Sequence, residues 1–314
     1  MRLNLNLIRF FGICLLIKVF CASLFAKDHH SSTIHIVYTA NLNCSLDDCR
    51  CSGNIVGGLT RIITVVDSLR AKFPNLILLD GGDHLSSYSL PEANRVMLSL
   101  LSRLHYTALN LGDQEFVESE NFVFEVSGEN KLRLPYISSN LFGENSSELL
   151  ADPFKVVSKT ETPVRILGCI DPGVFEFISP RHLTIKSPGE FLDQQTPANT
   201  GGSELQILLF HGKLQKAREL VKRNPWIDIV VLSHNQELRF DVEEKTAFVE
   251  SGTEGEYIGH LQINRNGDSW EFQNEFIPIY DRIPPNREAQ RRVDEYYRKI
   301  HRARNQGTTS QDSE

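Results

Sequence analysis

Short, continuous apolar runs alternate along this chain with segments whose apolar residues recur at helical spacing. Residues 34–38 predict a strand, and residues 57–72 predict a helix because Leu59, Ile62 and Val66 fall on one face. Continuous apolar strands separated by helices are typical of an α/β fold with a largely parallel sheet covered on both faces. The same alternation predicts strands at 76–80, 108–111, 164–168, 205–210, 227–232 and 246–250, and helices at 91–104 and 213–223.

The C-terminal third changes pattern. Residues 257–279 alternate apolar and polar around an Asn-Gly pair at 266–267, which predicts two antiparallel strands joined by a tight turn. Residues 282–304 predict a basic, amphipathic helix, and residues 305–314 are polar enough to predict a flexible tail. The stretch 179–204, rich in Pro, Gly, Thr and Gln, is the longest segment expected to be a loop.

The N-terminus has the pattern of a secretory signal. Basic Arg9 precedes an apolar run at 10–25, and a small residue ends the run before a polar segment. The run is short for a membrane span and is interrupted by Lys18, so we expect cleavage, no later transmembrane segment and export to the periplasm or cell envelope. Lipidation at Cys21 is the alternative. The expected organisation is a signal peptide (1–26), one domain (27–281), a basic helix (282–304) and a flexible tail (305–314).

The overall composition is that of an ordinary globular protein. Apolar residues make up 40% of the 314 residues and charged residues 23%, which excludes a disordered chain, a collagen-like repeat and a disulfide-dense miniprotein. Acidic residues outnumber basic ones by 40 to 33, for a formal net charge of −7. Because nucleic-acid binding needs basic surface, we expect no nucleic-acid partner.

Polar side chains of metal-binding types directly follow several predicted strands. A single His at such a place is usually a solvated or capping residue, and Gly-Asp is commonly a turn. Ligands of open α/β sheets, however, bind beyond the carboxyl ends of the strands, so several such residues together predict one site. The residues are Asn41, Asn43, Asp83, Asp113, His211 and His234.

The order and spacing of these segments resemble the calcineurin-like metallophosphoesterase superfamily, and within it the periplasmic 5′-nucleotidase (UshA-like) branch. The resemblance extends over residues 33–280 and implies a four-layer α/β/β/α metallophosphatase-like sandwich with mixed sheets. The segments that carry the resemblance are Thr39-Ala40-Asn41-Leu42-Asn43, Gly82-Asp83, Gly112-Asp113-Gln114-Glu115-Phe116, His211-Gly212 and Ser233-His234-Asn235-Gln236.

The resemblance also implies two metal positions that share one bridging aspartate. At the first position the residues that correspond to the family's ligands are neutral amides, which bind transition metals weakly, so we expect this position to be degenerate. At the second position two carboxylates and two imidazoles remain, a suitable set for one divalent ion such as Zn, Mn or Fe. The first set is Asn41, Asn43 and Gln236, and the second is Asp83, Asp113, His211 and His234.

Gln114 stands where the resemblance implies a histidine that protonates the leaving group. Glutamine cannot donate a proton to an alkoxide near neutral pH, and losing a general acid typically costs ~10²–10⁴ in rate. The catalytic residues therefore stay unknown, and we expect weak or altered hydrolysis of phosphate esters if the protein is an enzyme.

Three cysteines, Cys44, Cys49 and Cys51, crowd the loop after the first strand. The loop resembles that of an UshA-like (seleno)protein subgroup with a Cys-rich first loop. Such thiols can bind a soft metal, cycle between thiol and disulfide, or form a structural disulfide. Three functions therefore stay open: a divergent metal-dependent phosphoesterase, a thiol redox or metal-binding protein, and a pseudoenzyme that binds a ligand or partner. The ligand is expected to be a small phosphorylated or sulfur-containing molecule.

Overall fold

The computed structural model describes residues 33–311 except 49–52, 144–147, 177, 179–180, 196–203 and 268, and the side chains of 306–311 are not described either. Thr33–Glu314 forms one compact unit. The expected signal peptide and Cys21 lie outside the described residues, as do Cys49 and Cys51. No helix within the described ranges combines the length and the apolar character needed to cross a membrane.

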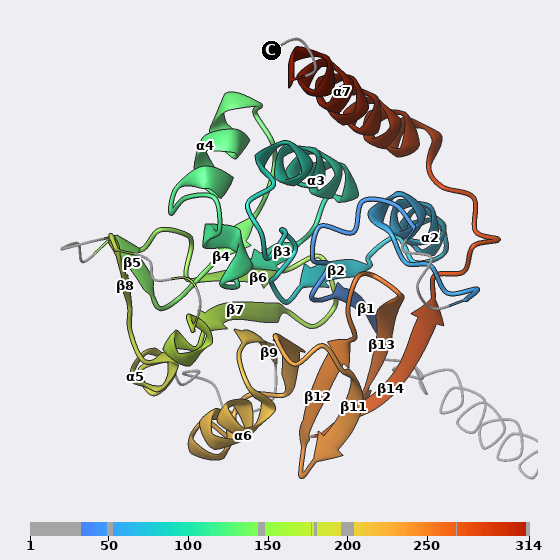
Figure 1. The fold of residues 1–314 in the computed structure, drawn as a ribbon. Coiled ribbons are helices and arrows are strands. Elements are labelled where there is room, and N and C mark those ends of the chain that lie inside the picture. Colours follow the sequence, from blue (N-terminus) through green and yellow to red (C-terminus); the bar gives the residue numbers. More distant parts are fainter. Residues whose placement is uncertain are drawn as a thin grey trace, which may run out of the picture. The chain divides into compact units, whose positions relative to one another are not determined.

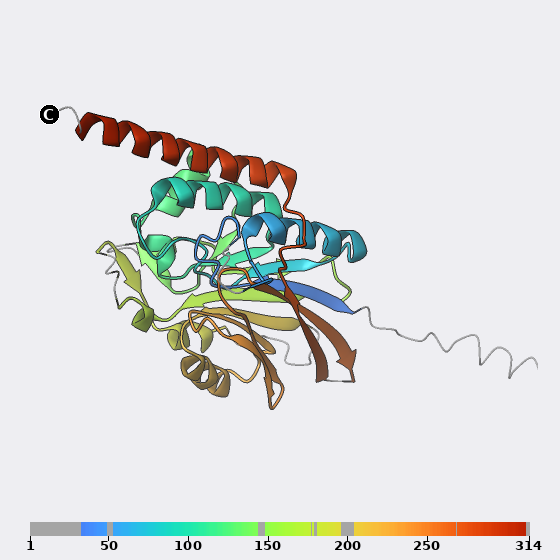
Figure 2. The same cartoon turned by 45° about the vertical axis from the view of Figure 1, so that its right-hand side comes forward.

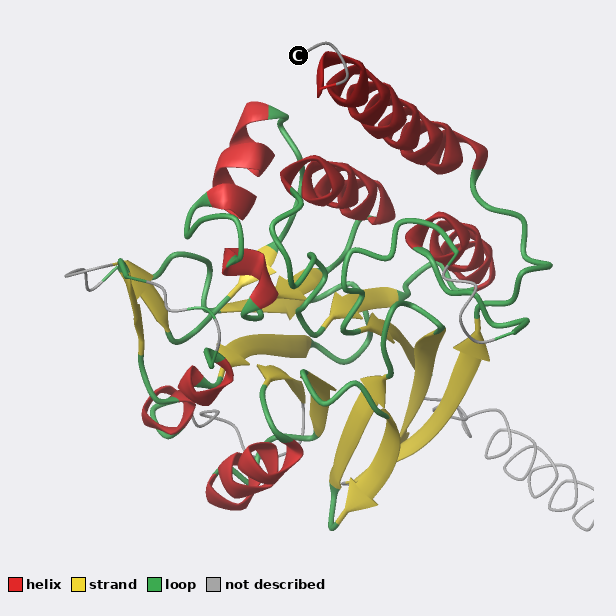
Figure 3. Ribbon diagram, viewed as in Figure 1, coloured by secondary structure: helices red, strands yellow, loops and turns green. Residues whose placement is uncertain are grey.

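Two six-stranded sheets, each mixing parallel and antiparallel pairs, form the centre of this unit (Figures 1 and 3). The first runs in the order β14 (Ser269–Pro278), β13 (Tyr257–Asn266), β1 (Ile34–Thr39), β2 (Ile77–Asp80), β3 (Ala108–Asn110), β4 (Tyr136–Ile137). The second runs in the order β11 (Leu238–Glu243), β12 (Thr246–Ser251), β10 (Ile229–Ser233), β9 (Leu205–His211), β7 (Val164–Ile170), β6 (Phe154–Val157).

The sheets face each other across a core of alternating strand residues such as Ile36, Leu79, Ile207 and Val231. Helices cover both outer faces, so the expected four-layer α/β/β/α sandwich is confirmed (Figure 2). The helices on the first sheet are α2 (Leu59–Lys72), α3 (Pro91–Leu104) and α4 (Phe122–Glu129). Those on the second are α5 (Pro188–Leu192) and α6 (Leu214–Arg223).

The C-terminal helix begins later and extends further than the sequence pattern predicts. Helix α7 runs from Arg287 to Gln311 and packs on α3 and α2 (Figure 2). Pro284 and Pro285 cannot continue a helical hydrogen-bond ladder, and Asn286 caps the helix because its Oδ1 accepts the Glu288 and Ala289 N–H groups. The helix therefore begins at 287 instead of the expected 282, and it continues to 311, into the segment expected to be a flexible tail.

The segment expected to be one long loop at 179–204 contains β8 (Leu183–Ile185), which pairs with β5 (Leu141–Gly143), and also helix α5. Elements of three to five residues are too short for a helical or strand period to stand out, so the pattern does not reveal them. The longer strands that the sequence pattern predicts agree with it to within about two residues, because strands such as β9 and β10 are buried along their whole length and read as continuous apolar runs. The pattern does not predict β11, whose six residues are all at least partly exposed.

Candidate metal centre

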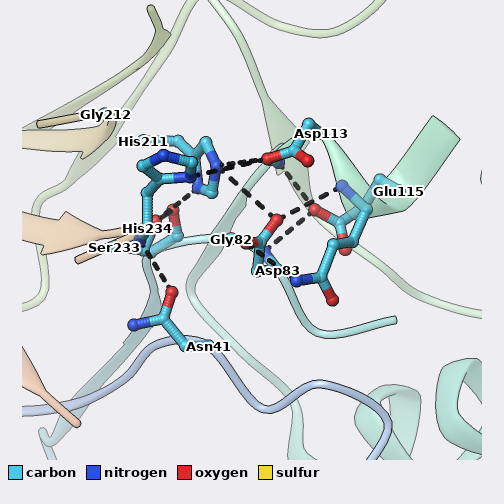
Figure 4. Close-up of polar contacts among 12 residues, drawn as sticks. Asn41, Gly82, Asp83, Asp113, Glu115, His211, Gly212, Ser233 and His234 are labelled. Atoms are coloured by element: carbon cyan, nitrogen blue, oxygen red, sulfur yellow. Dashed lines mark hydrogen bonds and ion pairs between the residues drawn. The ribbon is translucent and has the colours of Figure 1, made fainter. Parts of the chain in front are cut away.

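Four of the predicted site residues meet at the carboxyl ends of strands from both sheets (Figure 4). Asp83 follows β2 and Asp113 follows β3, whereas His211 ends β9 and His234 follows β10. One potential ligand atom from each residue lies within 4.8 Å of the other three. Among the residues that the structure describes, this is the only group of three or more His, Cys, Asp or Glu side chains placed in this way.

His211 is fully buried and its ring is held in one orientation. The Ser233 hydroxyl donates its single proton to the carbonyl oxygen of Gly81 at 2.6 Å, so it must accept the Nδ1–H of His211 at 2.7 Å. Nε2 therefore points into the site, 3.0 Å from Asp113 Oδ1 and 3.5 Å from Asp83 Oδ1. Fixing the tautomer through the distal nitrogen is how proteins prepare a histidine for a metal.

Glu115 is fully buried and accepts hydrogen bonds from the backbone around Asp83. Glu115 Oε2 accepts the N–H groups of Asp83 and Gly112 at 3.0 and 2.6 Å. Its Oε1 accepts those of His84 and Leu85 at 3.0 and 3.2 Å. Gly112 has to be glycine here, because a Cβ would lie 2.3 Å from Asp83 Oδ1. Four N–H groups on one carboxylate fix the direction in which Asp83 presents its oxygens.

Five site positions have backbone dihedrals that residues other than glycine seldom adopt. The φ angles lie between 49° and 89° at Asn41, Asn43, Asp83, His234 and Gln236. Such strained residues collect at functional sites, where the surrounding structure holds them. Here hydrogen bonds supply that restraint: Asn41 N–H donates to Gly82 O at 3.0 Å and Asn43 N–H to Asp83 O at 2.9 Å.

The ionisation of the cluster is that of a site built for a cation. Burial, together with the charges of Asp113 and Glu115, raises the pKa of Asp83 to about 7. Burial alone would lower the pKa of His211, but Asp83 and Asp113 outweigh it and raise the pKa to about 9. Burial acts to raise the pKa of Asp113, yet hydrogen bonds from His211 and His234 lower it. At neutral pH without a metal, His211 is therefore protonated, and its positive charge lies next to the two carboxylates that would bind a divalent ion.

The donor set fits one divalent transition metal. Two imidazoles and two carboxylates are ligands for Zn, Mn or Fe. Asp113 and His234 keep 16% and 26% of their side chains exposed, whereas Asp83 and His211 are buried. A bound ion would therefore be held from the protein side and stay open to a ligand from solvent.

The amides at the other position are engaged in hydrogen bonds to protein groups. Asn41 is fully buried and its side-chain nitrogen donates to Glu250 Oε1 at 3.0 Å, while the Asn43 amide donates to Thr253 Oγ1 at 2.8 Å. Gln236 is exposed, and it is its backbone N–H that reaches Glu250, at 2.8 Å. The structure therefore brings the side chains of Asn41 and Asn43 to the site, whereas Gln236 is joined to it through its backbone.

Cys44 is a free thiol that packs against the apolar core under the helices, near α7. Burial, together with the Glu118 charge, raises the pKa of the Cys44 thiol to about 12, and its thiolate charge would act on Tyr296 and Tyr297. A thiol in this environment is a poor thiolate ligand or nucleophile. The described part of the loop therefore gives the thiol-chemistry hypothesis no support.

Three residues that organise the site do not stand out in the sequence. Glu115 lies inside one of the family-like motifs but has no predicted role, and Ser233 and Glu250 stand at the ends of predicted strands. The one local signal for Glu115 is its position three residues after Gly112, at the start of a short turn, where an acidic side chain can accept the Gly112 N–H. Glu250 gave no local signal, because its partner Asn41 is 209 residues away in the chain.

No family model matches the chain. It is similar to the 5′-nucleotidase of Naja atra venom, with 23% identity over 208 residues, 60% of this chain and 37% of the venom protein. The chain therefore spans about two fifths of the length of the curated relatives it matches. At this identity the similarity is a distant relationship to 5′-nucleotidases.

Solved structures share the fold over most of the chain. A 5′-nucleotidase precursor from Thermus thermophilus gives a TM-score of 0.74 at 19% identity, covering 86% of this chain and 59% of that one. The calcineurin-like phosphoesterase YfkN from Bacillus subtilis gives 0.68 at 17%, covering 85% and 97%. The sulfate thiohydrolase SoxB from Thermus thermophilus gives 0.72 at 12%, covering 84% and 60%. The expected metallophosphatase-like fold is thus confirmed.

Proposed function

We propose that the protein is a metal-dependent, phosphoesterase-like hydrolase that works with one divalent ion instead of two. The observation that carries the proposal is the convergence of Asp83, Asp113, His211 and His234 within 4.8 Å at the strand ends. A metal bound there would polarise an ester oxygen and lower the pKa of a bound water. These four side chains would hold the ion, and the partly exposed Asp113 and His234 keep the site accessible from solvent.

Gln114 limits which esters such a site can cleave. Its side-chain nitrogen donates to Asp83 Oδ2 at 3.1 Å and its backbone N–H to Asp83 Oδ1 at 3.2 Å, so it orients the aspartate. It has no proton to give to a departing alkoxide. We therefore propose substrates whose leaving group is stable without protonation, such as an aryl oxide, a phosphate or a thiolate. A small phosphorylated or sulfur-containing ester meets this condition, and SoxB shows that the fold is used by a sulfate thiohydrolase.

A ligand-binding protein without turnover is the second candidate, and the same residue favours it. An amide at position 114 can hold Asp83 for metal and ligand binding without supporting acid catalysis. For either role we propose export to the periplasm or envelope, based on the basic and apolar N-terminal pattern.

The test is hydrolysis of p-nitrophenyl phosphate and of an alkyl phosphate by purified protein, after chelation and after titration with Mn²⁺ or Zn²⁺. We expect aryl ester cleavage that appears with one equivalent of metal and is lost in Asp113→Ala, with the alkyl ester near background. Metal binding to one equivalent without any turnover would favour the ligand-binding role. No metal uptake by the folded protein would refute both.

A further inference from the structure

At the position that the family resemblance assigns to a first metal, the amide groups of Asn41 and Asn43 donate hydrogen bonds to other protein groups. Asn41 Nδ2 uses both of its protons, donating to Glu250 Oε1 at 3.0 Å and to the Gly252 carbonyl at 2.9 Å. Asn41 Oδ1 accepts the backbone N–H of His234 at 2.7 Å (Figure 4). The amide therefore joins the ends of β1, β10 and β12 without an ion.

The other two residues of that set are tied to the same segment, Glu250–Thr253. Asn43 Nδ2 donates to Thr253 Oγ1 at 2.8 Å, and the Gln236 N–H donates to Glu250 Oε1 at 2.8 Å. Glu250 is fully buried and receives two donors on one oxygen. A transition metal here would have to displace these donors from Glu250 Oε1. Apart from Glu250 and the shared Asp83 it would meet only neutral amides, so the residues present do not fit it.

We propose that Glu250 and the segment Glu250–Thr253 replace the first metal as a metal-free cross-link, and that through Asn41 they hold His234 in place for the remaining metal. Glu250 is then a positioning residue. The inference concerns hydrogen bonding at this position and stands whether or not the proposed hydrolase activity exists.

The polarity of the pair supports this proposal. Asn41 is the donor and Glu250 is the acceptor, and both side chains are fully buried. An aspartate at 41 would place an oxygen about 3 Å from both Glu250 Oε1 and the Gly252 carbonyl oxygen. Like charges this close in a buried site are strongly unfavourable without a proton or cation between them. Asn41 and Glu250 are therefore matched to each other.

The first experiment measures thermal stability in the presence of chelator. We expect Asn41→Asp to lower the Tm by at least about 5 °C because it opposes two acceptors. Asn41→Asp/Glu250→Gln removes one of the two opposed charges, while the Gly252 carbonyl and the Gln236 N–H keep their positions, so we expect part of that loss to be recovered. A Tm of Asn41→Asp equal to the wild type, or no recovery in the double variant, would overturn the proposal.

The second experiment measures how many metal ions bind and how tightly, by calorimetry and elemental analysis. We expect one equivalent in the wild type. Metal affinity should fall at least about tenfold in Glu250→Ala, because Asn41 then loses the partner through which it positions His234. Metal affinity should be retained in Glu250→Gln, which keeps an acceptor oxygen for Asn41. Val249→Ala is the matched control, since it truncates a buried side chain next door in β12 and should lower Tm without changing metal affinity.

Glu250 Oε2 accepts no hydrogen bond among the described residues, so it is the atom that an ion would use if the first position still bound one. Two tightly bound equivalents in the wild type and one in Glu250→Ala would show this and would overturn the metal-free cross-link. Equal metal affinity in the wild type and Glu250→Ala would overturn the positioning role.

Discussion

Replacing Glu115 by glutamine tests whether one buried carboxylate holds the metal-binding loop. In Glu115→Gln an NH₂ group takes the place of one oxygen, so two of the four backbone N–H groups now bound lose their acceptor and face a donor. Each buried, unsatisfied donor costs about 1–3 kcal/mol, so the variant should lose roughly 2–6 kcal/mol of unfolding free energy. That is a large share of the total stability of a typical domain, about 5–15 kcal/mol.

The free energy of unfolding is measured by urea unfolding in the presence of chelator, with circular dichroism as the readout. Metal affinity is measured by titrating the folded protein with Mn²⁺ or Zn²⁺. The N–H groups of Asp83 and His84 are among those bound by Glu115, so metal affinity should fall with stability. Glu129→Gln is the matched control, because its ion pair with Arg95 lies on the surface and should be worth about 0.5 kcal/mol or less. A loss below about 1 kcal/mol in Glu115→Gln with unchanged metal affinity would refute this reasoning.

Three further predictions concern protons. Metal uptake should release protons, because His211, with its pKa near 9, and Asp83, with its pKa near 7, must both lose a proton before they bind a metal. Metal affinity should therefore fall about 10²–10³-fold from pH 8 to pH 6. Calorimetry in two buffers counts the released protons, and a metal affinity that does not change with pH would contradict this. Gln114→His should raise the rate on alkyl phosphates by up to ~10²-fold and change aryl phosphates little, and an equal gain on both would exclude a proton-donor effect. Burial and the charge of Lys72 lower the pKa values of His35 and His260 below 6.5, and the neighbouring His260 lowers the pKa of His35 further. The unfolded chain therefore gains protons first, and stability should drop as pH falls below about 6.5. His260→Gln should lessen that drop in Tm, and an unchanged profile would argue against the pair.

The fold could be predicted from the alternation of strands and helices, and the candidate set of four residues from the strand ends together with the family resemblance. Asp83, Asp113, His211 and His234 each stand at or just after the end of an apolar strand, two on each sheet, and the strand ends of both sheets meet at the candidate site. Short strands such as β4 and β8 could not be predicted, because two or three residues carry no period.

The residues that hold the site in place depend on contacts that no local pattern contains. Asn41 and Glu250 are 209 residues apart, and Asp83 and Glu115 are 32 apart. Only the packing of the two sheets decides that one carboxylate faces an amide and the other faces backbone N–H groups. The sequence shows that position 41 is not a carboxylate, but it does not show that the carboxylate of Glu250, on β12, contacts the Asn41 side chain.

The absence of a carboxylate at 41 and the presence of one at 250 are consequences of a single electrostatic condition. A buried carboxylate is stable when donors or a cation compensate its charge. Asp83 and Asp113 meet this condition with His211 and, when it is bound, a metal. Glu250 meets it with the Asn41 amide and a backbone N–H, and the amide is lost if residue 41 is an acid that requires a cation itself. In the proposed arrangement Asn41, which contacts both Glu250 and His234, therefore lies between the candidate ligand set for an ion and the part of the site that is held by hydrogen bonds.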